Sequence, residues 1–454
     1  MKYVRSMALA LAVSGAASSS LALAQNTTED RLQRIETQLK EMESRHAAEL
    51  QKRDAKIADL EKQLQSRSDT LTEEQRAKEI DRVTNEVLAD IKRREAAGPA
   101  GRLQQAASNL QIAVAADFVA NYSSRNVDGA RNRADIREVE LELRAPVDPR
   151  ADAVVGIAFE RDAAPELFGG EDLEGPETEA AIEEAYLFLH DFGVQNLTAK
   201  VGRYAVSFGR SNIMHLHELP TVDQPFVIQS HLAAEGLKDA GLSLSYVVPN
   251  PANEYIEAIL EVNSGEGAGS ESPTLRGDLN STAPSVNGRV LWNKNLAQNL
   301  NLELGGSALY APSENKDKGN RDLWLLGGDV TLVRRDPTGG FANQFLQAEV
   351  IYGAVDQEDG TRVNSWGAYV LGQQQLAKDW YAGLRLDYTQ DANNSSQEIW
   401  GLSPYVTWQW SEFLRFRAQY QYREATDSNG EHIFFLQVTF VMGSHKAHPY
   451  WAFR

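Results

Sequence analysis

Two periodicities of apolar and polar residues divide the chain. Between residues 30 and 64, apolar side chains recur at steps of three and four residues, which is the heptad seam of a coiled coil with one stutter near His46. The seam positions are Leu32, Ile35, Leu39, Met42, His46, Leu50, Ile57, Leu60 and Leu64. The other positions are nearly all charged or polar, so one helix cannot bury this narrow stripe alone. The pattern predicts an α-helical coiled coil, and a solvated helix without a partner is the alternative.

A second helical stretch follows the first. Thr70 and Glu73 have the spacing of a capping box, which predicts a restart of the helix, and residues 98–101 (Gly-Pro-Ala-Gly) end it. We therefore place a coiled coil at residues 25–97, a linker at residues 98–109 and a β-barrel at residues 110–454. At about 1.5 Å per residue, the first helix is long enough to extend into the periplasm, where peptidoglycan is a candidate partner.

From residue 110 onward the period changes to two, as in β-strands. Soluble β-sandwiches show the same alternation, so the period alone leaves both architectures open. The lengths of the connections separate them, because short and long connections alternate strictly in a membrane barrel with periplasmic turns and extracellular loops. Short connections lie at residues 146–150, 191–196, 249–254, 293–299, 335–343, 376–379 and 411–412, and long polar ones at residues 161–178, 205–240 and 264–284.

The strand count is about 16, an even number within the range of bacterial barrels. We predict an all-β transmembrane barrel of antiparallel strands, preceded by an α-helical coiled coil. An even count places both barrel ends on the periplasmic side, where the coiled coil must also lie. Aromatic residues near the strand ends fit the two interfacial girdles of membrane barrels; among them are Tyr246, Trp292, Tyr310, Trp380, Trp400, Trp410 and Tyr422.

The polar faces of the strands predict an aqueous lumen, since a barrel of this size encloses more volume than its side chains fill. The residues expected to line it are Glu138, Glu140, Glu142, Glu257, Glu261, Glu303, Glu349, Arg385, Arg415, Arg417 and Arg423. The four arginines form a basic wall late in the barrel. The carboxylates nevertheless predict a weak cation preference.

The amino-terminal residues predict a secretory signal peptide. Lys2 and Arg5 precede an apolar run, and Ala22-Leu23-Ala24 has the small residues of a cleavage site, so we expect residues 1–24 to be removed. A membrane-spanning helix is the alternative, but residues 18–20 interrupt the run and it is short for that purpose. The later chain holds no apolar stretch of spanning length.

Composition excludes several classes of function. The chain has no cysteine, which excludes disulfides and thiolate chemistry, and its 45 Lys and Arg residues against 64 Asp and Glu residues argue against nucleic acid as a partner. No motif places an activated nucleophile beside a base, so we do not expect an enzyme. No cofactor is required, and zinc is the one candidate.

Three segments resemble known proteins. They are Val201-Gly202-Arg203-Tyr204 with Phe208-Gly209-Arg210-Ser211-Asn212, then His215-Leu216-His217 with Asp223-Gln224-Pro225-Phe226, and finally residues 435–440 with residues 443–449. Together they resemble outer-membrane barrels labelled zinc-regulated and, more distantly, the phosphate-selective porins of the O/P family. The resemblance implies a sixteen-stranded, trimeric porin. Selectivity for phosphate would need a basic ladder along the lumen, whereas this chain offers many inward glutamates.

The longest connection is the candidate pore constriction. We expect residues 211–240 to enter the lumen and narrow it, with an apolar patch at residues 226–228 packed on the wall; an outer loop that covers a neighbouring subunit is the alternative. The expected constriction residues are Arg203, Arg210, His215, His217, Glu218, Asp223 and His231. The sequence His-x-His can offer imidazoles to a transition metal, with Glu218 or Asp223 as a carboxylate ligand.

Polar loop histidines bonded to the backbone are the competing interpretation of His215 and His217, and it applies equally to His445 and His448. The sequence thus predicts an outer-membrane channel for passive diffusion of small hydrophilic solutes or ions, a homotrimer surrounded by outer-membrane lipid. The alternatives are a structural tether between the outer membrane and the cell wall, and a metal (zinc) uptake channel.

Overall fold

The computed structural model describes residues 110–125, 132–161, 178–265, 267, 274, 284–312, 314–315, 319–320, 322–357, 359–426 and 428–444. Every described residue belongs to one unit of the chain, Arg102–Arg454. The predicted signal peptide, coiled coil and linker lie outside the described residues, as do His445 and His448. No helix in the described ranges is long and apolar enough to cross a membrane.

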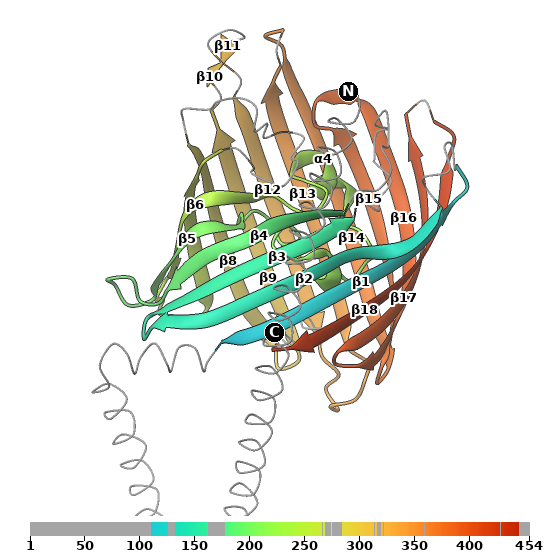
Figure 1. Ribbon diagram of the computed structural model, residues 1–454, viewed down its shortest axis with the longest axis horizontal. Helices are drawn as coiled ribbons and strands as arrows, with labels where there is room; N and C mark the ends of the chain where they lie inside the picture. The colour runs from blue at the N-terminus through green and yellow to red at the C-terminus, as the bar shows by residue number, and fades with distance from the viewer. Residues whose placement is uncertain are drawn as a thin grey trace, which may run out of the picture. The chain divides into compact units, whose positions relative to one another are not determined.

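Sixteen strands form one closed antiparallel barrel, which confirms the predicted barrel and strand number (Figure 1). In ring order these strands are β1 (Gln111–Ser123), β2 (Arg133–Asp148), β3 (Ala151–Arg161), β4 (Thr178–Leu189), β5 (Leu197–Ala205), β6 (Lys238–Val247), β7 (Tyr255–Asn263), β8 (Ser285–Ala297), β9 (Leu300–Ala311), β12 (Leu323–Arg334), β13 (Gln344–Asp356), β14 (Arg362–Ala377), β15 (Trp380–Asp391), β16 (Asn394–Ser411), β17 (Leu414–Ala425) and β18 (Glu431–Gly443). The first and last strands pair with each other, from Ala113 opposite Gly443 to Ser123 opposite Ile433, and so close the ring. A small hairpin of β10 (Glu314–Asn315) and β11 (Gly319–Asn320) lies between β9 and β12.

The strands turn their apolar faces outward. On β18, Leu436 is 62% exposed whereas its neighbour Gln437 is 1% exposed, and the same contrast recurs around the ring. Successive side chains of a strand point to opposite faces, so one alternation produces both surfaces. A water-soluble protein would place these two faces the other way round.

Aromatic side chains gather near both ends of the barrel. At the end that carries the turn between β16 and β17, the rings of Trp380 and Trp408 stack with centroids 5.5 Å apart, and Trp410 packs against Trp408 at 4.8 Å. At the opposite end, Trp366 lies 4.8 Å from Tyr388 and Trp400 lies 5.2 Å from Tyr422. The barrel therefore has an apolar band with an aromatic belt at either edge.

The expected strict alternation of short and long connections holds only in the first half of the barrel. There, the connections at residues 149–150, 190–196 and 248–254 alternate with longer ones at 162–177, 206–237 and 264–284. In the second half, residues 357–361 and 392–393 form tight links at the end where long loops were expected. The thickness of an apolar layer fixes strand length but not loop length, so the pattern need not persist.

Candidate functional site

The connection between β5 and β6 folds into the interior of the barrel. These residues, 206–237, are called the inner segment below. It contains a short 3₁₀ helix, η1 (Leu216–Glu218), and a short α-helix, α4 (Phe226–His231), which lies against β13, β14 and β15 (Figure 1). Most of its side chains are buried inside the ring of strands. The segment thus belongs to the interior of the ring.

One asparagine closes the neck of the inner segment. The Val206 amide donates to the carbonyl of Leu237 at 2.9 Å. The side-chain amide of Asn212 donates to the Val206 carbonyl at 2.8 Å, and its oxygen accepts from the Leu237 amide at 2.6 Å. The two ends of the inner segment are therefore hydrogen-bonded to each other where the chain enters and leaves the barrel interior.

Backbone amides after the neck bind carboxylates of the wall. The Ser207 amide donates to Glu261 on β7 at 2.9 Å, and the Ser211 amide donates to Glu349 on β13 at 3.2 Å. Between them, Gly209 has a φ of +63°, and a Cβ atom there would lie 1.6 Å from a Glu349 oxygen. Only glycine permits this close approach.

An apolar patch inside the barrel holds the next part of the inner segment. Phe208, Val227 and Ile228 are fully buried and belong to one cluster with Leu325 of β12 and Ile351 of β13. The polar faces of the strands predicted a polar interior. The structure shows instead that some strand residues facing the interior are apolar. Burial of apolar side chains is worth about 1.5–3 kcal/mol each, so this patch is a substantial anchor.

The basic wall binds the inner segment instead of facing an open lumen. Arg385 of β15 is completely buried and its Nη2 lies 3.0 Å from the Asp223 carboxylate. Arg417 donates to the carbonyls of Leu219 and Thr221, at 2.7 Å each, and Arg415 donates to the carbonyl of His217 at 2.5 Å. Burial opposes ionisation of Asp223, but Arg385 beside it lowers its pKa below the usual value. Arg423, farther along β17, pairs with Glu431 at 2.7 Å.

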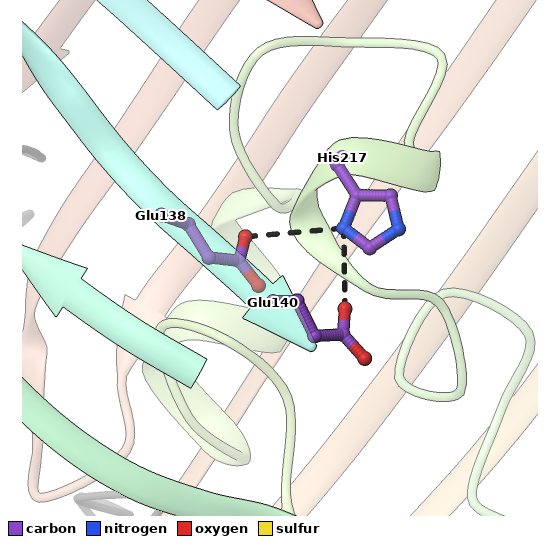
Figure 2. Close-up of side chains that lie close together, drawn as sticks. All are labelled: Glu138, Glu140 and His217. Atoms are coloured by element: carbon purple, nitrogen blue, oxygen red, sulfur yellow. Dashed lines mark ion pairs between the residues drawn. The ribbon is translucent and has the colours of Figure 1, made fainter. Parts of the chain in front are cut away.

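The wall strands β2 and β4 present carboxylates to the two histidines of the His-x-His motif. Glu140 Oε2 lies 3.5 Å from His215 Nδ1 and 3.4 Å from His217 Nδ1. Glu138 Oε2 is 4.0 Å from His217 Nδ1, and Figure 2 shows both glutamates directed at this ring. Glu183 Oε2 is 3.3 Å from His215 Nδ1. We call Glu138, Glu140, Glu183, His215 and His217 the acidic histidine cluster.

The cluster affects its two histidines differently. Burial alone would lower the pKa of His215, but the carboxylates of Glu140 and Glu183 raise it well above its usual value. For His217 burial prevails and lowers the pKa, although Glu140 opposes the change. The two rings stack with centroids 5.6 Å apart. One imidazole is therefore held charged beside a neighbour that is held neutral.

β-Bulges add two charged residues, Arg137 and Glu183, to the inward face of this wall. On β2, Glu138 pairs with Asp117 and Ile136 with Phe118, which leaves Arg137 in a bulge. Arg137 and Glu138 are 7% and 3% exposed, so consecutive residues both point inward. On β4 the register shift opposite Gly156 likewise leaves Glu183 extra, and it is 3% exposed. A bulge places two residues opposite one and so breaks the strict inside-outside alternation.

The other predicted constriction residues are dispersed. Arg203 belongs to the wall strand β5, where it pairs with Ala240, and the expected segment end at residue 240 lies within β6. Arg210 forms an ion pair of 3.0 Å with Glu303. Glu218 accepts a bond from the His215 amide at 3.3 Å. None of these three joins His215 and His217 in a shared ligand set among the described residues.

His231 lies away from the other two histidines. It is fully buried on α4, and its Nε2 is 3.0 Å from Ser365 Oγ of β14. Burial lowers its pKa to about 4. It therefore docks the helix as a neutral imidazole.

The remaining predicted lumen glutamates sit in two environments. Glu142 and Glu257 are partly exposed; Glu142 pairs with Arg144 at 3.2 Å, and Glu257 accepts a bond of 2.8 Å from Tyr255. Glu261 and Glu349, by contrast, are buried beneath the inner segment, as described above. Most of the predicted lumen lining is thus covered by the segment.

Sequence reasoning missed several residues that shape this interior. Glu183 and Lys238 form a buried ion pair beside the histidines, and Arg289 holds Asp329 at 2.7 Å below the segment. A signal for the first was present, because the adjacent glutamates 183 and 184 interrupt an otherwise alternating strand. Such an interruption indicates a bulge. No comparable signal marks Asn212.

Comparisons with known proteins support the fold. No family model matches the chain. An uncharacterized protein of Aquifex aeolicus is 24% identical over 355 residues, which cover 70% of each chain. Among solved structures, OprB of Pseudomonas putida has a TM-score of 0.53 at 10% identity and spans 75% of this chain and 96% of its own. The outer membrane channel DcaP of Acinetobacter baumannii has a TM-score of 0.52 at 11% identity, with 73% and 97% covered.

A third solved structure, the anion-selective porin of Comamonas acidovorans, has a TM-score of 0.50 at 11% identity and covers 73% of this chain and 99% of its own. Identities this low show a shared architecture and nothing finer. The chain therefore shares the barrel fold of these three structures.

Proposed function

We propose that this protein is an outer-membrane channel through which small hydrophilic solutes or ions diffuse passively. The observation that carries the proposal is the inverted barrel, with an apolar band outside and polar residues inside. Such a surface is stable only where lipid covers it, and aromatic belts at both edges match the two interfaces of a bilayer. The structural neighbours include the outer membrane channel DcaP, which agrees with this assignment.

The proposal gives the inner segment the role of the constriction. It bonds to Glu261 of β7, Glu349 of β13, Arg385 of β15 and Arg417 of β17. Solutes pass beside a docked segment and not through an empty ring. The partly exposed glutamates give the passage a weak cation preference.

The proposal also places the parts of the chain in the cell envelope. Residues 1–24 are the signal peptide, and residues 25–97 form a periplasmic coiled coil that reaches peptidoglycan. Because both barrel ends lie at the edge that carries the short turns of β2–β3 and β16–β17, this edge is periplasmic. The heptad seam requires partner helices, and the assembly we propose is a homotrimer of the zinc-regulated porin type.

Planar bilayers test the channel directly. Purified protein should insert and give stepwise current increments, and the reversal potential in a salt gradient should show weak cation preference that decreases at high salt. A protein that inserts without conductance would overturn the channel and favour a purely structural tether.

A further inference from the structure

The acidic histidine cluster has a geometry that the proposed channel does not use. Glu138, Glu140 and His217 each offer one ligand atom, and these atoms all lie within 4.8 Å of one another (Figure 2). All three residues are buried. Two come from β2 and the third from the inner segment, so the group joins the wall to the segment.

The distances match those that a tetrahedral metal would impose. Ligand atoms at about 2.0–2.1 Å from zinc, separated by a tetrahedral angle, lie roughly 3.3–3.4 Å from each other. Glu140 Oε2 and His217 Nδ1 are 3.4 Å apart, and Glu138 Oε2 and His217 Nδ1 are 4.0 Å apart. The first pair needs no movement, and the second would have to shorten by about 0.6–0.7 Å.

The glutamates carry a second, independent sign of a ligand. Glu138 Oε2 and Glu140 Oε2 are buried and accept no hydrogen bond from the described part of the chain, although their residues are only 3% and 5% exposed. Buried carboxylate oxygens are normally hydrogen-bonded, because water has been removed from them at a large cost. Both oxygens are aimed at the same imidazole nitrogen, and a cation at their centre would satisfy both.

We propose that Glu138, Glu140 and His217 bind one divalent transition-metal ion, such as zinc, and that this ion ties the inner segment to β2. One imidazole with two carboxylates suits zinc and its neighbours, whereas calcium and magnesium prefer oxygen ligands alone. A fourth position remains for water or for a shift of His215. The site does not depend on the channel function, since binding is measured without current.

The ligand atoms of Glu140, Glu183 and His215 also lie within 4.8 Å of one another, but this group is a weaker candidate for a metal site. Lys238 forms an ion pair with Glu183 and already balances its charge. Glu140 is shared by both groups, so it is the residue on which binding depends most. The structure therefore assigns one ion per chain.

Calorimetric titration of the full-length protein in detergent with zinc chloride, after EDTA treatment, tests the site. The wild type should bind one ion per chain. Glu140→Gln should weaken binding by roughly 10–100-fold or more, because even indirect partners of a metal have effects of that size. Glu138→Gln and His217→Gln should also weaken it. Glu261→Gln and His231→Gln are matched controls, since both residues are buried and neither belongs to the cluster. Glu261 contacts the inner segment, and His231 is part of it.

Folding of each variant is checked by heat-modifiable migration in gels. A second readout needs no variant: X-ray absorption at the zinc edge of the wild type should show one imidazole among oxygen ligands. The proposal is overturned if Glu140→Gln binds zinc as the folded wild type does, if the wild type binds none at millimolar zinc, or if the absorption spectrum shows no imidazole.

Discussion

The side chain of Asn212 bonds to the backbone of Leu237 through both of its polar atoms. Its oxygen accepts from the Leu237 amide at 2.6 Å, and its nitrogen lies 3.2 Å from the Leu237 carbonyl. The same nitrogen reaches the Val206 carbonyl at 2.8 Å. The neck of the inner segment is therefore closed before any contact with the wall is made.

Asn212→Ala should open this neck. The Leu237 amide would lose its partner in a buried place, which costs about 1–3 kcal/mol. Hydrogen exchange measured by mass spectrometry should become faster over residues 206–237 and stay unchanged in the strands. Asn295→Ala is the control, because Asn295 is exposed at the far end of β8. Equal exchange in the wild type and Asn212→Ala would show that the neck is held by other contacts.

Gly209→Ala should disturb the barrel more than its size suggests. The new Cβ would collide with the Glu349 carboxylate, at a φ of +63° that is costly for alanine. We expect a lower unfolding temperature in detergent. Gly372→Ala is the matched control, since a Cβ there meets nothing within 4 Å. The close approach would be refuted by two variants of equal stability.

Asp223→Asn should loosen the contact of the inner segment with β15. Arg385 is completely buried and would keep only Asp387, at 2.7 Å, as a charged partner. Loss of one partner from a buried pair costs about 3–5 kcal/mol, and the remaining aspartate reduces that figure. Single-channel records should become noisier, with transitions to a larger conductance. Asp336→Asn, in the turn after β12, should leave them as they are.

Acid should weaken the docking of α4. Burial sets the pKa of His231 at about 4 in the docked state, below the usual 6.5, so the undocked state takes up the proton first. The docked state therefore loses stability as the pH falls from about 6.5 to 4, by up to about 3 kcal/mol. Its described neighbours, Ser365 of β14 and Gly353 of β13, carry no charge that would offset this effect.

The measurement is hydrogen exchange of residues 226–231 at pH 7 and pH 4, with the intrinsic rates corrected for pH. His231→Gln keeps a donor toward Ser365 but does not titrate, and it should remove the part of the acid response that belongs to His231. An identical response in both proteins would assign the effect to the carboxylates elsewhere in the barrel.

The barrel could be predicted from the sequence because the alternation of apolar and polar residues recurs from strand to strand. The inside-outside alternation, exemplified by Leu436 and Gln437 on β18, needs only local information. The position of the inner segment was also predictable as a hypothesis, from its length and place after the fifth strand. Its contacts were not, since Arg385 and Asp223 are separated by 162 residues and their pairing depends on the path of the chain across the ring.

Glu138 and Glu140 were expected to face the lumen, but the inward positions of Arg137 and Glu183 escaped prediction for a physical reason. Alternation assigns Arg137 and Glu138 to opposite faces, yet a bulge turns both inward, and the same happens at Glu183 and Glu184. A bulge adds one residue to one strand only, so it is defined by the partner strand as much as by its own sequence. The inward apolar patch at Leu325 and Ile351 was missed because an apolar residue facing the interior is stabilised only when the inner segment packs on it. That contact cannot be read from the strand alone.

The constriction is the central claim, and single-channel conductance after deletion of residues 221–230 tests it most directly. This deletion removes Asp223 and most of α4, which hold the inner segment to β15 and β17. A deletion of equal length within residues 162–177 is the control. The account predicts a larger unitary conductance for the first deletion alone, in a barrel that still shows heat-modifiable migration. An unchanged conductance in such a folded barrel would contradict it.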